Sequence, residues 1–270
     1  MVRGLNKKII SGLLFLTLIQ STTKLTYAAD AKNTTGNGIV QYEVNDEKTV
    51  PVDPEHPEEA INVPESEYTS TSGLLRFDFI PNLHFGAQAI SSKDSVYEVN
   101  AQLFSDTRSA RPNHVQITDN RGEISGWELS VKQDTQFYSD DDKKEELKGV
   151  ILSFDKQWAN STMSKEYSPT IVKDAIKIEQ IGASYPIAKA EPGKGAGTWE
   201  IVFGSTGEIE GIEKTLTPLL NAEGQPVTNP LFNNNGVYKN SAIRLFVPSK
   251  STKHPAKYKT ELTWTLSELT

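Results

Sequence analysis

Cysteine is absent from this chain of 270 residues, and methionine and histidine are scarce, with two and four copies. Without cysteine the chain cannot form a disulfide bond, a thiol nucleophile or a thiolate metal site. The histidines also lie far apart, and none belongs to a His-Glu-x-x-His motif or to an i, i+4 pair: His56, His84, His114 and His254. The sequence therefore predicts no bound metal.

Sequence patterns that would indicate an enzyme are missing as well. Lysines follow the acidic run 140–142, and Glu145 stands where a calcium loop needs glycine, which favours a solvated loop. The glycine-rich stretch 193–197 lacks the Gly-Lys-Ser/Thr ending of a phosphate-binding loop and precedes a predicted strand, so we interpret it as a flexible turn. A glycosidase needs two carboxylates about 5–9 Å apart, and no pair stands out among the many acids. We predict no catalytic residue, no cofactor and no enzymatic activity.

The N-terminus has the three parts of a secretory signal peptide. Arg3, Lys7 and Lys8 form a basic region, and the apolar run 9–19 is too short to span a bilayer comfortably. Thr26 and Ala28 then supply small residues at a cleavage site. We predict a signal peptide over residues 1–28 and a secreted mature chain, with a retained membrane anchor as the alternative. No second apolar run follows, so we expect no membrane span in the mature chain.

Acidic residues outnumber basic ones. The formal net charge is −7, and removal of residues 1–28 leaves 24 basic against 35 acidic residues, a charge of −11. Such a chain does not attract nucleic acid or anionic lipid by its overall charge. We therefore expect no nucleic-acid partner.

Much of this acidic surplus lies directly after the predicted signal peptide. Between residues 41 and 70 there are nine acidic residues and one lysine, and the stretch is interrupted by Pro51, Pro54, Pro57 and Pro64. Proline removes backbone donors, and like charges repel, so such a stretch stays extended. We predict an acidic, proline-containing and largely disordered spacer over residues 29–72.

From residue 73 onward, apolar and polar residues alternate in short segments. The alternation covers residues 75–79, 115–118, 127–132, 198–203, 243–247 and 262–266. A period of two predicts strands with one buried face, and turn sequences such as 119–122, 192–197 and 233–236 separate them. The best helical candidate, 208–220, is weak. We predict an all-β fold over residues 73–270: an antiparallel β-sandwich or barrel-like module with short strands and long loops.

Two similar triplets stand out in this β region. Trp127-Glu128-Leu129 and Trp264-Thr265-Leu266 lie 137 residues apart, the second close to the end of the sequence. In a strand each triplet places an indole and a leucine on the same face. With their contexts, 115–122 before the first triplet, 197–204 between them and 256–267 around the second, they resemble the WxL family of Gram-positive surface proteins. The stretch 208–239 is longer than is usual in that family.

The resemblance implies a binding protein that is exported and held non-covalently at the cell wall, with peptidoglycan as its ligand. It also implies partners among surface proteins encoded nearby, so a second hypothesis is an interaction subunit whose ligand is another wall-associated protein. A polysaccharide-active enzyme is a third, less favoured hypothesis. The motif residues, Trp127, Leu129, Trp264 and Leu266, bury a large apolar area if they face the core. The alternative is that the indoles are exposed and stack on sugar rings.

One stretch is basic. Between residues 239 and 260 there are six lysines and arginines and no acidic residue. We identify four of these lysines as candidate contacts for an anionic ligand: Lys250, Lys253, Lys257 and Lys259. The alternative is that they protect a strand edge from pairing with other chains.

Overall fold

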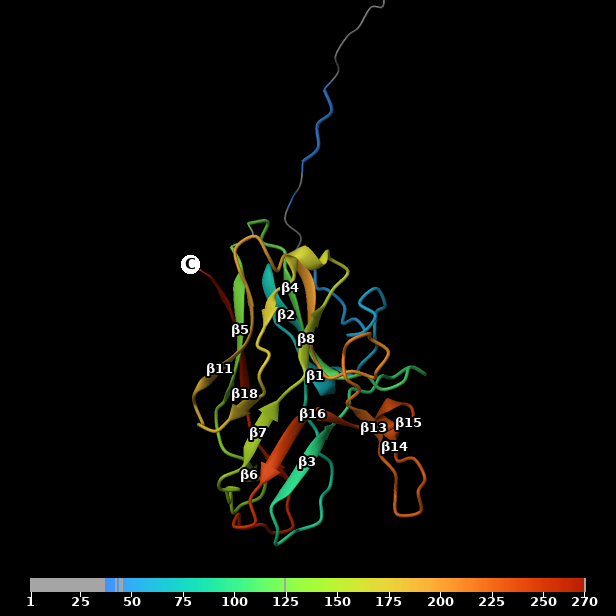
Figure 1. Cartoon of the computed structure of the whole chain (residues 1–270), viewed down its shortest axis with the longest axis vertical. Coiled ribbons are helices and arrows are strands. Elements are labelled where there is room, and N and C mark those ends of the chain that lie inside the picture. The colour runs from blue at the N-terminus through green and yellow to red at the C-terminus, as the bar shows by residue number, and fades with distance from the viewer. Residues whose placement is uncertain (1–36, 42, 44–45, 124, 270) are drawn as a thin grey trace, which may run out of the picture. The chain divides into compact units, whose positions relative to one another are not determined.

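The computed structural model describes residues 37–41, 43, 46–123 and 125–269. The predicted signal peptide, residues 1–28, lies outside the described residues. The chain divides into two units, Met1–Tyr42 and Glu43–Thr270, and the strands of the described residues all belong to the second (Figure 1). Within the described residues, no helix has the length and apolar character needed to cross a membrane.

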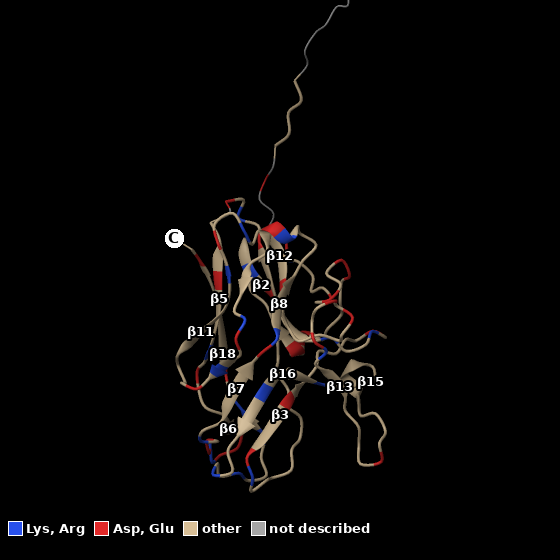
Figure 2. Cartoon of the chain, in the orientation of Figure 1, with Lys and Arg blue, Asp and Glu red and all other residues tan. Residues whose placement is uncertain are grey.

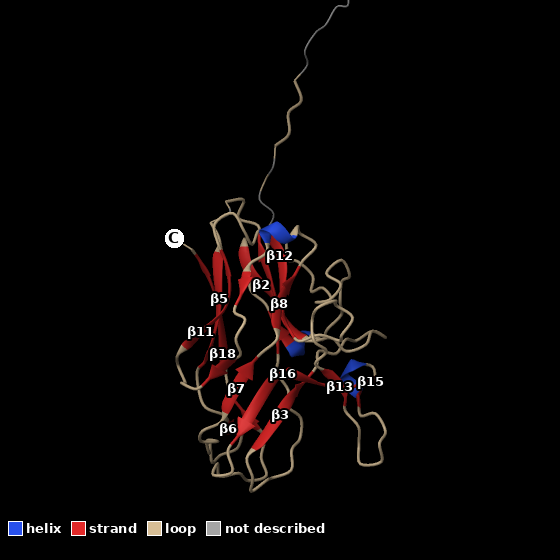
Figure 3. Ribbon diagram, in the orientation of Figure 1, coloured by secondary structure: helices blue, strands red, loops and turns tan. Residues whose placement is uncertain are grey.

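The fold is all-β, as the alternation predicts (Figure 3). One sheet has the order β1-β2-β4-β12-β8 and a second has the order β18-β5-β11-β9. The third has the order β10-β7-β16-β13, and β3 also pairs with β16. All these pairs are antiparallel, and the sheets pack together without closing into a barrel. Of the two predicted architectures, the barrel-like one is therefore not formed.

Most strands are short, between two and seven residues long, and β16 is the longest with ten. The first sheet contains β1 (Tyr68–Thr69), β2 (Leu75–Pro81), β4 (Asn113–Asp119), β12 (Gly197–Phe203) and β8 (Gln157–Asn160). The second contains β18 (Leu262–Glu268), β5 (Trp127–Gln133), β11 (Ser184–Ala190) and β9 (Thr170–Ile171). The third contains β10 (Ile176–Ile178), β7 (Ile151–Phe154), β16 (Tyr238–Val247), β13 (Leu216–Pro218) and β3 (Ser95–Asn100). Two small pairs join β14 (Thr228–Asn229) to β15 (Asn235–Gly236) and β17 (Tyr258–Lys259) to β6 (Tyr138–Ser139).

One apolar core joins the three sheets. The first sheet contributes Val115 and Ile117, the second contributes Leu129, and the third contributes Leu152 and Leu245, all of them buried. Most of these are apolar members of the alternating segments, so the local sequence pattern largely selects which side chains enter the core.

The indole of Trp127 is fully buried and rests against the glycine-rich turn 193–197. Its Nε1 donates to the carbonyl oxygen of Gly195 at 3.0 Å, and the Nε1 of Trp199 donates to the next carbonyl, that of Ala196, at 2.9 Å. A Cβ on Gly195 would lie 2.4 Å from the Trp127 Nε1. The turn therefore has a structural role, because its carbonyl oxygens accept hydrogen bonds from two tryptophan indoles. The interpretation as a flexible turn misses this role.

The stretch 208–239, expected to be a longer, member-specific region, forms β13, β14, β15 and a 3₁₀ turn at Pro230–Phe232. The weak helical candidate 208–220 is wrong, because no α-helix forms there. Phe232 and Leu216 join a second, smaller apolar cluster with Phe79, Leu103 and Phe104. The stretch thus contributes side chains to this second cluster, which includes Phe79 of the first sheet.

The opposite face of the first sheet is polar, yet it is buried. Glu200 and His114 are completely buried although the alternation predicts that they point outward to solvent. Every residue of the central strand β4 is buried, so both faces of this sheet are covered.

Residues 47–61, which we call the strap, form that cover. Asp53 is completely buried and accepts hydrogen bonds from the Arg111 side chain, and Glu55 accepts from Ser205 and Thr206. The prediction of a largely disordered spacer over residues 29–72 is therefore wrong for the strap and for β1. The prediction failed because the acidic surplus is matched by basic and hydroxyl side chains that lie more than fifty residues away in sequence.

Under the strap, Glu200 and His114 face each other, with the His114 Nε2 and the Glu200 Oε2 3.5 Å apart. Neither side chain has a hydrogen-bond partner among the described residues. Burial raises the pKa of Glu200 well above its usual value, and burial lowers the pKa of His114 to about 4. The distance alone fits an ion pair, but two charges without further hydrogen bonds are costly in the interior. We therefore assign both groups as neutral.

Trp127→Ala should lower the free energy of unfolding by about 3–5 kcal/mol, because it leaves a large cavity in the core. Gly195→Ala should also lower the free energy of unfolding, because the added methyl group would collide with the Trp127 indole. Overpacking of this kind costs about 1–3 kcal/mol. Urea unfolding followed by tryptophan fluorescence measures both effects.

Gly193→Ala is the matched control for this prediction. Gly193 lies in the same turn and also has a positive φ, 87° against 79° for Gly195, but a Cβ there meets nothing within 4 Å. Both variants carry the backbone strain of a left-handed residue, about 1–2 kcal/mol. Equal losses in the two variants would show that the indole does not rest on Gly195.

Glu200→Gln should make the protein more stable above pH 5 and leave it unchanged near pH 4. A carboxyl group whose pKa is raised in the folded state stabilises below its unfolded pKa, and that contribution is lost as pH rises toward the folded pKa. Removing the titration should add up to about 1.4 kcal/mol for each pH unit in that window. Thermal melts between pH 4 and 8 measure the difference.

The acidic limb of the same curves serves as an internal control. His114, with its lowered pKa, stabilises the fold above pH 6.5, and this contribution is lost as pH falls toward about 4. The acidic limb should therefore remain in Glu200→Gln. A variant that is less stable than the parent protein at pH 7 would contradict the neutral assignment and indicate a charged Glu200–His114 pair.

Candidate functional site

The two Trp-x-Leu triplets lie side by side in space. They occupy β5 and β18, which pair antiparallel, and the register places Leu266 opposite Leu129 and Trp264 opposite Val131. Strand β18 is the outer strand of its sheet, whereas β5 is held on both sides, by β18 and β11. The two triplets therefore have different surroundings although their sequences are alike.

Burial divides the motif residues into two pairs. Trp127 and Leu129 are completely buried, so for these two the interpretation as core residues matches the structure. Trp264 and Leu266 are only partly buried. Within the described residues, Trp264 is the tryptophan whose indole N–H has no protein acceptor, whereas the indoles of Trp127, Trp158 and Trp199 each donate to a backbone carbonyl.

One side of Trp264 packs on the core. Its ring meets Phe154 edge-on at a centroid distance of 5.8 Å and lies 6.3 Å from the ring of Phe203. These contacts fix the plane of the indole, since aromatic pairs prefer tilted and edge-to-face arrangements. The remaining part of the ring is available to a ligand.

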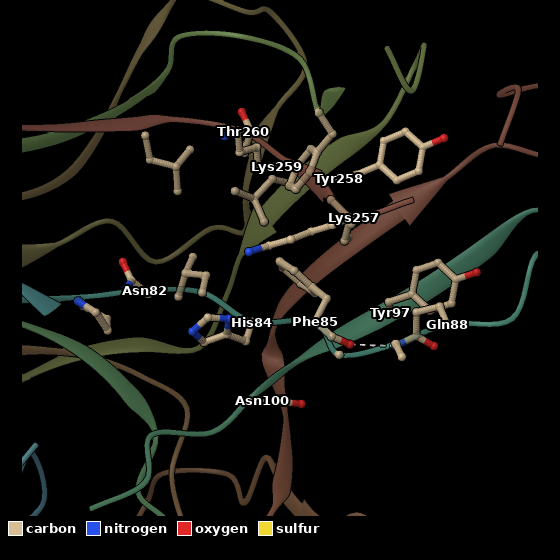
Figure 4. A pocket seen from close by; sticks show the side chains of 18 of the residues that line it. Asn82, His84, Phe85, Gln88, Tyr97, Asn100, Lys257, Tyr258, Lys259 and Thr260 are labelled. Atoms are coloured by element: carbon tan, nitrogen blue, oxygen red, sulfur yellow. Dashed lines mark hydrogen bonds between the residues drawn. The ribbon is translucent and has the colours of Figure 1, made fainter. Parts of the chain in front are cut away.

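That part borders a cleft of about 1240 Å³, whose floor and walls are largely apolar. Trp264 and Leu262 of β18 form one wall, and the loop from Asn82 to Ile90 forms another. The aromatic residues Phe85, Tyr97 and Tyr258 are partly exposed within it. Figure 4 shows that residues of β3, of the 82–90 loop and of the segment 257–260 converge on this space. The lining thus combines apolar and aromatic side chains with polar and charged ones, a combination that ligand sites share.

The four candidate lysines differ in whether they line the cleft. Lys253, Lys257 and Lys259 line the cleft, and Lys250 does not. Lys259 is paired with Asp140 at 2.6 Å, and Lys253 donates to the carbonyls of Pro248 and Ser251. Lys257 is exposed and has neither an ion pair nor a side-chain hydrogen bond among the described residues. Figure 4 shows its side chain extending toward the side of the cleft formed by His84 and Phe85.

A partly buried lysine holds the loop wall in place. The Nζ of Lys239 donates to Asn100 Oδ1 at 2.7 Å, to the Phe85 carbonyl at 3.0 Å and to the Glu98 carbonyl at 3.2 Å. Burial lowers its pKa. Three segments thus meet at one ammonium group, which fixes the position of Phe85 in the cleft.

The run Asp140–Asp142 lies close to the cleft. Asp141 accepts from His254 at 2.8 Å, and Glu145 lies 2.9 Å from the other nitrogen of the same ring. Hydrogen bonds from Ser139 and His254 hold the pKa of Asp141 well below its usual value. Figure 2 shows acidic and basic residues intermixed in the loops around β6. Asp141 and Glu145 are therefore both engaged by the His254 ring.

Several cleft residues are absent from the sequence-based candidates. Tyr97 belongs to a strand that the alternation does not predict, and His84 and Phe85 carry no motif of their own. His84 pairs with Glu67 at 2.9 Å at one end of the cleft. These residues come together only through the pairing of β3 with β16, in which Lys239 faces Asn100. No local signal could have found them.

A family model described as "WxL domain surface cell wall-binding" matches residues 29–269. Neither the curated proteins nor the solved structures include a match to this chain.

Proposed function

The chain belongs to the WxL family of cell wall-binding surface proteins, and we propose that it is secreted and held non-covalently at a Gram-positive cell wall by peptidoglycan. We place the binding site in the cleft beside Trp264. Nearly the whole chain matches a family of wall-binding domains rather than a family of enzymes, which favours binding over catalysis.

The observation that carries this proposal is the unequal burial of the two motifs. Trp127 is enclosed and has its hydrogen bond, so it cannot reach a ligand. Trp264 presents part of its ring to a cleft, and its orientation is fixed from behind by Phe154. A rigid aromatic surface beside partly exposed Tyr97 and Tyr258 suits the apolar faces of sugar rings, and hydroxyl and amide groups at the rim can accept and donate to sugar hydroxyls.

The charge of the cleft supports a ligand with anionic groups. Lys257 is the cleft lysine that lacks an ion pair or side-chain hydrogen bond among the described residues. Of the acids nearby, Asp141 is engaged by His254 and Asp140 by Lys259, and Glu261 also lines the cleft. An unpaired cation beside an aromatic surface can contact a carboxylate or phosphate of a wall polymer without breaking an existing ion pair.

Trp264→Ala should weaken binding of the mature protein to purified, protein-free sacculi by about tenfold, the equivalent of about 1.4 kcal/mol. The loss is expected because the exposed part of the indole is a contact surface for the ligand. A sedimentation assay over a range of sacculus concentrations gives the apparent affinity.

Leu266→Ala is the matched control. Leu266 lies on the same face of the same strand and is also partly buried, but it does not line the cleft. It should lose stability through the lost packing and yet bind like the parent protein while folded. Failure of the parent protein itself to bind bare sacculi, with binding restored by a wall-associated protein, would favour the alternative of an interaction subunit.

Lys257→Gln should weaken binding by about 0.2–1 kcal/mol, the range for an exposed ion pair, and reduce its dependence on salt. Lys250→Gln removes the same charge from the same basic stretch but outside the cleft, so it should leave affinity and salt dependence unchanged. Sedimentation at several ionic strengths tests both. Equal effects of the two substitutions would show that the cleft lysine makes no specific contact.

A further inference from the structure

The outer edge of β18 is long and uncharged. β18 has seven residues, and among the described strands β5 alone pairs with it. Residues 262–267 include no charged residue and no proline. A free strand edge of this kind can pair with another chain, which natural sheets usually prevent with charges, proline or a short edge strand.

The other outer strands of the three described sheets have these protections. β1 and β9 are two residues long, and β8 is four residues long. β10 carries Lys177 at its centre, β13 ends with Pro218, and β3 carries Glu98. Of these edges, the one at β18 is therefore the best suited to pairing with another chain.

Two hydrogen bonds at the ends of β18 show which of its backbone groups face outward. The Glu261 carbonyl accepts from the Asp134 N–H at 3.0 Å, and the Leu269 N–H donates to the Gly126 carbonyl at 3.3 Å. Alternate residues of an antiparallel strand direct their N–H and C=O groups to opposite sides, so the odd-numbered residues of β18 bond to β5. The even-numbered residues direct theirs to the free edge.

These outward backbone groups belong to Leu262, Trp264 and Leu266. Within the described residues, no hydrogen bond outside the β5–β18 ladder involves the backbone of these three residues. No residue of β18 is buried, so the edge is open to solvent. The edge therefore presents a row of donors and acceptors that a further strand could satisfy.

The sequence of β18 reads the same in both directions around Trp264. Residues 262–266 are Leu-Thr-Trp-Thr-Leu. If the strand pairs antiparallel with its own copy about a two-fold axis at Trp264, leucine faces leucine, threonine faces threonine and the two tryptophans face each other. Cross-strand pairs of aromatic residues and of threonines stabilise a sheet. The strand is thus complementary to itself, which identifies a second copy as the partner.

The charges next to β18 are compatible with the same register. Continued beyond the palindrome, it places Glu261 opposite Ser267 and Glu268 opposite Thr260. No acid then faces an acid, whereas like charges directly opposite each other destabilise a strand pair.

The two faces of β18 also match in such a pair. Thr263 and Thr265 are exposed on one face, and Leu262, Trp264 and Leu266 are partly buried on the face that packs on the core. A two-fold axis perpendicular to the sheet keeps the apolar faces of both copies on the same side. Pairing would therefore cover more of the partly buried leucines while the threonines stay on the polar face.

We infer that β18 is a self-association edge: two copies of the chain pair β18 with β18, antiparallel, around a two-fold axis at Trp264. The second sheet then runs through both copies in the order β9-β11-β5-β18-β18-β5-β11-β9. Leu262 of one copy lies opposite Leu266 of the other, and Thr263 lies opposite Thr265. The interaction uses the backbone edge of β18, so it goes beyond wall binding and does not depend on the ligand of the cleft.

Sedimentation velocity of the full mature chain over a range of concentrations gives its oligomeric state. The parent protein should approach the mass of two chains as its concentration rises. A parent protein that remains a monomer at every concentration would overturn the inference. Sacculi are absent from this experiment, so its outcome is separate from the success or failure of the proposed wall binding.

Two double variants test whether β18 forms the interface. Thr263→Glu with Thr265→Glu places acid opposite acid in the paired strands and should weaken the dimer by about tenfold. Thr263→Glu with Thr265→Lys places acid opposite ammonium at the same positions and should dimerise at least as well as the parent protein. Both threonines are exposed in the single chain, so thermal melts should show that both variants are folded. Equal dimerisation of the two variants would place the interface elsewhere and overturn the inference.

Disulfide cross-linking tests the register, because the chain has no cysteine of its own. Thr263 and Thr265 of the two copies form a pair without mutual hydrogen bonds, whose Cα atoms lie about 4.5 Å apart, within the range of a disulfide. A mixture of the Thr263→Cys and Thr265→Cys variants should therefore cross-link under mild oxidation faster than either variant alone.

Each single variant is the control for a shifted register. A two-fold axis at residue 263 would cross-link Thr263→Cys with itself, and an axis at residue 265 would do the same for Thr265→Cys. Mass spectrometry of the digested product identifies the linked peptides. Cross-linking of a single variant as fast as the mixture, or no cross-link in the mixture, would overturn the pairing around Trp264.

Discussion

The placement of β5 between β18 and β11 is the constraint on which the rest of the structure depends. The buried indole of Trp127 anchors β5, because it packs against the 193–197 turn and donates to the Gly195 carbonyl. The outer strand β18 has only β5 as a hydrogen-bonded neighbour among the described strands. If β5 shifted by one residue, every side chain of its alternating pattern would change face, and Trp264 would lose its place at the cleft. A core tryptophan thus determines where a partly exposed one stands.

This arrangement explains why one chain contains two copies of a short motif with different roles. A Trp-x-Leu triplet in a strand always puts two large apolar side chains on one face. In the central strand, the pair is fully enclosed and becomes core. In the outer strand, the same pair is covered from one side only, and the indole remains partly accessible. The position of the strand in its sheet therefore determines whether the motif is enclosed in the core or remains partly accessible.

Local pattern predicted the strands well but not what covers them. The alternating segments 115–118, 127–132 and 262–266 became β4, β5 and β18 with small changes at the ends, because a period of two depends only on neighbouring residues. Burial of Glu200 and the order of the strap could not be predicted in this way, since they depend on pairs such as Asp53 and Arg111, 58 residues apart. The cleft is a similar case. Its lysines stand in a visible basic stretch, but Phe85 and Tyr97 reach it only through long-range contacts, among them the pairing of β3 with β16.

The distribution of charge follows from the same long-range pairing. The sequence suggests an acidic protein that repels an anionic polymer, with a formal charge of −7 for the whole chain. In the folded unit, however, Asp53 and Glu55 are enclosed by Arg108, Arg111 and hydroxyl groups, so their charge is compensated within the strap's seat. Beside the cleft, Asp140 and Asp141 are paired with Lys259 and His254, while Lys257 stays unpaired among the described residues. Screening limits the reach of distant charges to about 8–10 Å. The charges that act within the cleft are therefore those of Lys257, its paired neighbours and Glu261, and the overall acidity of the chain contributes little there.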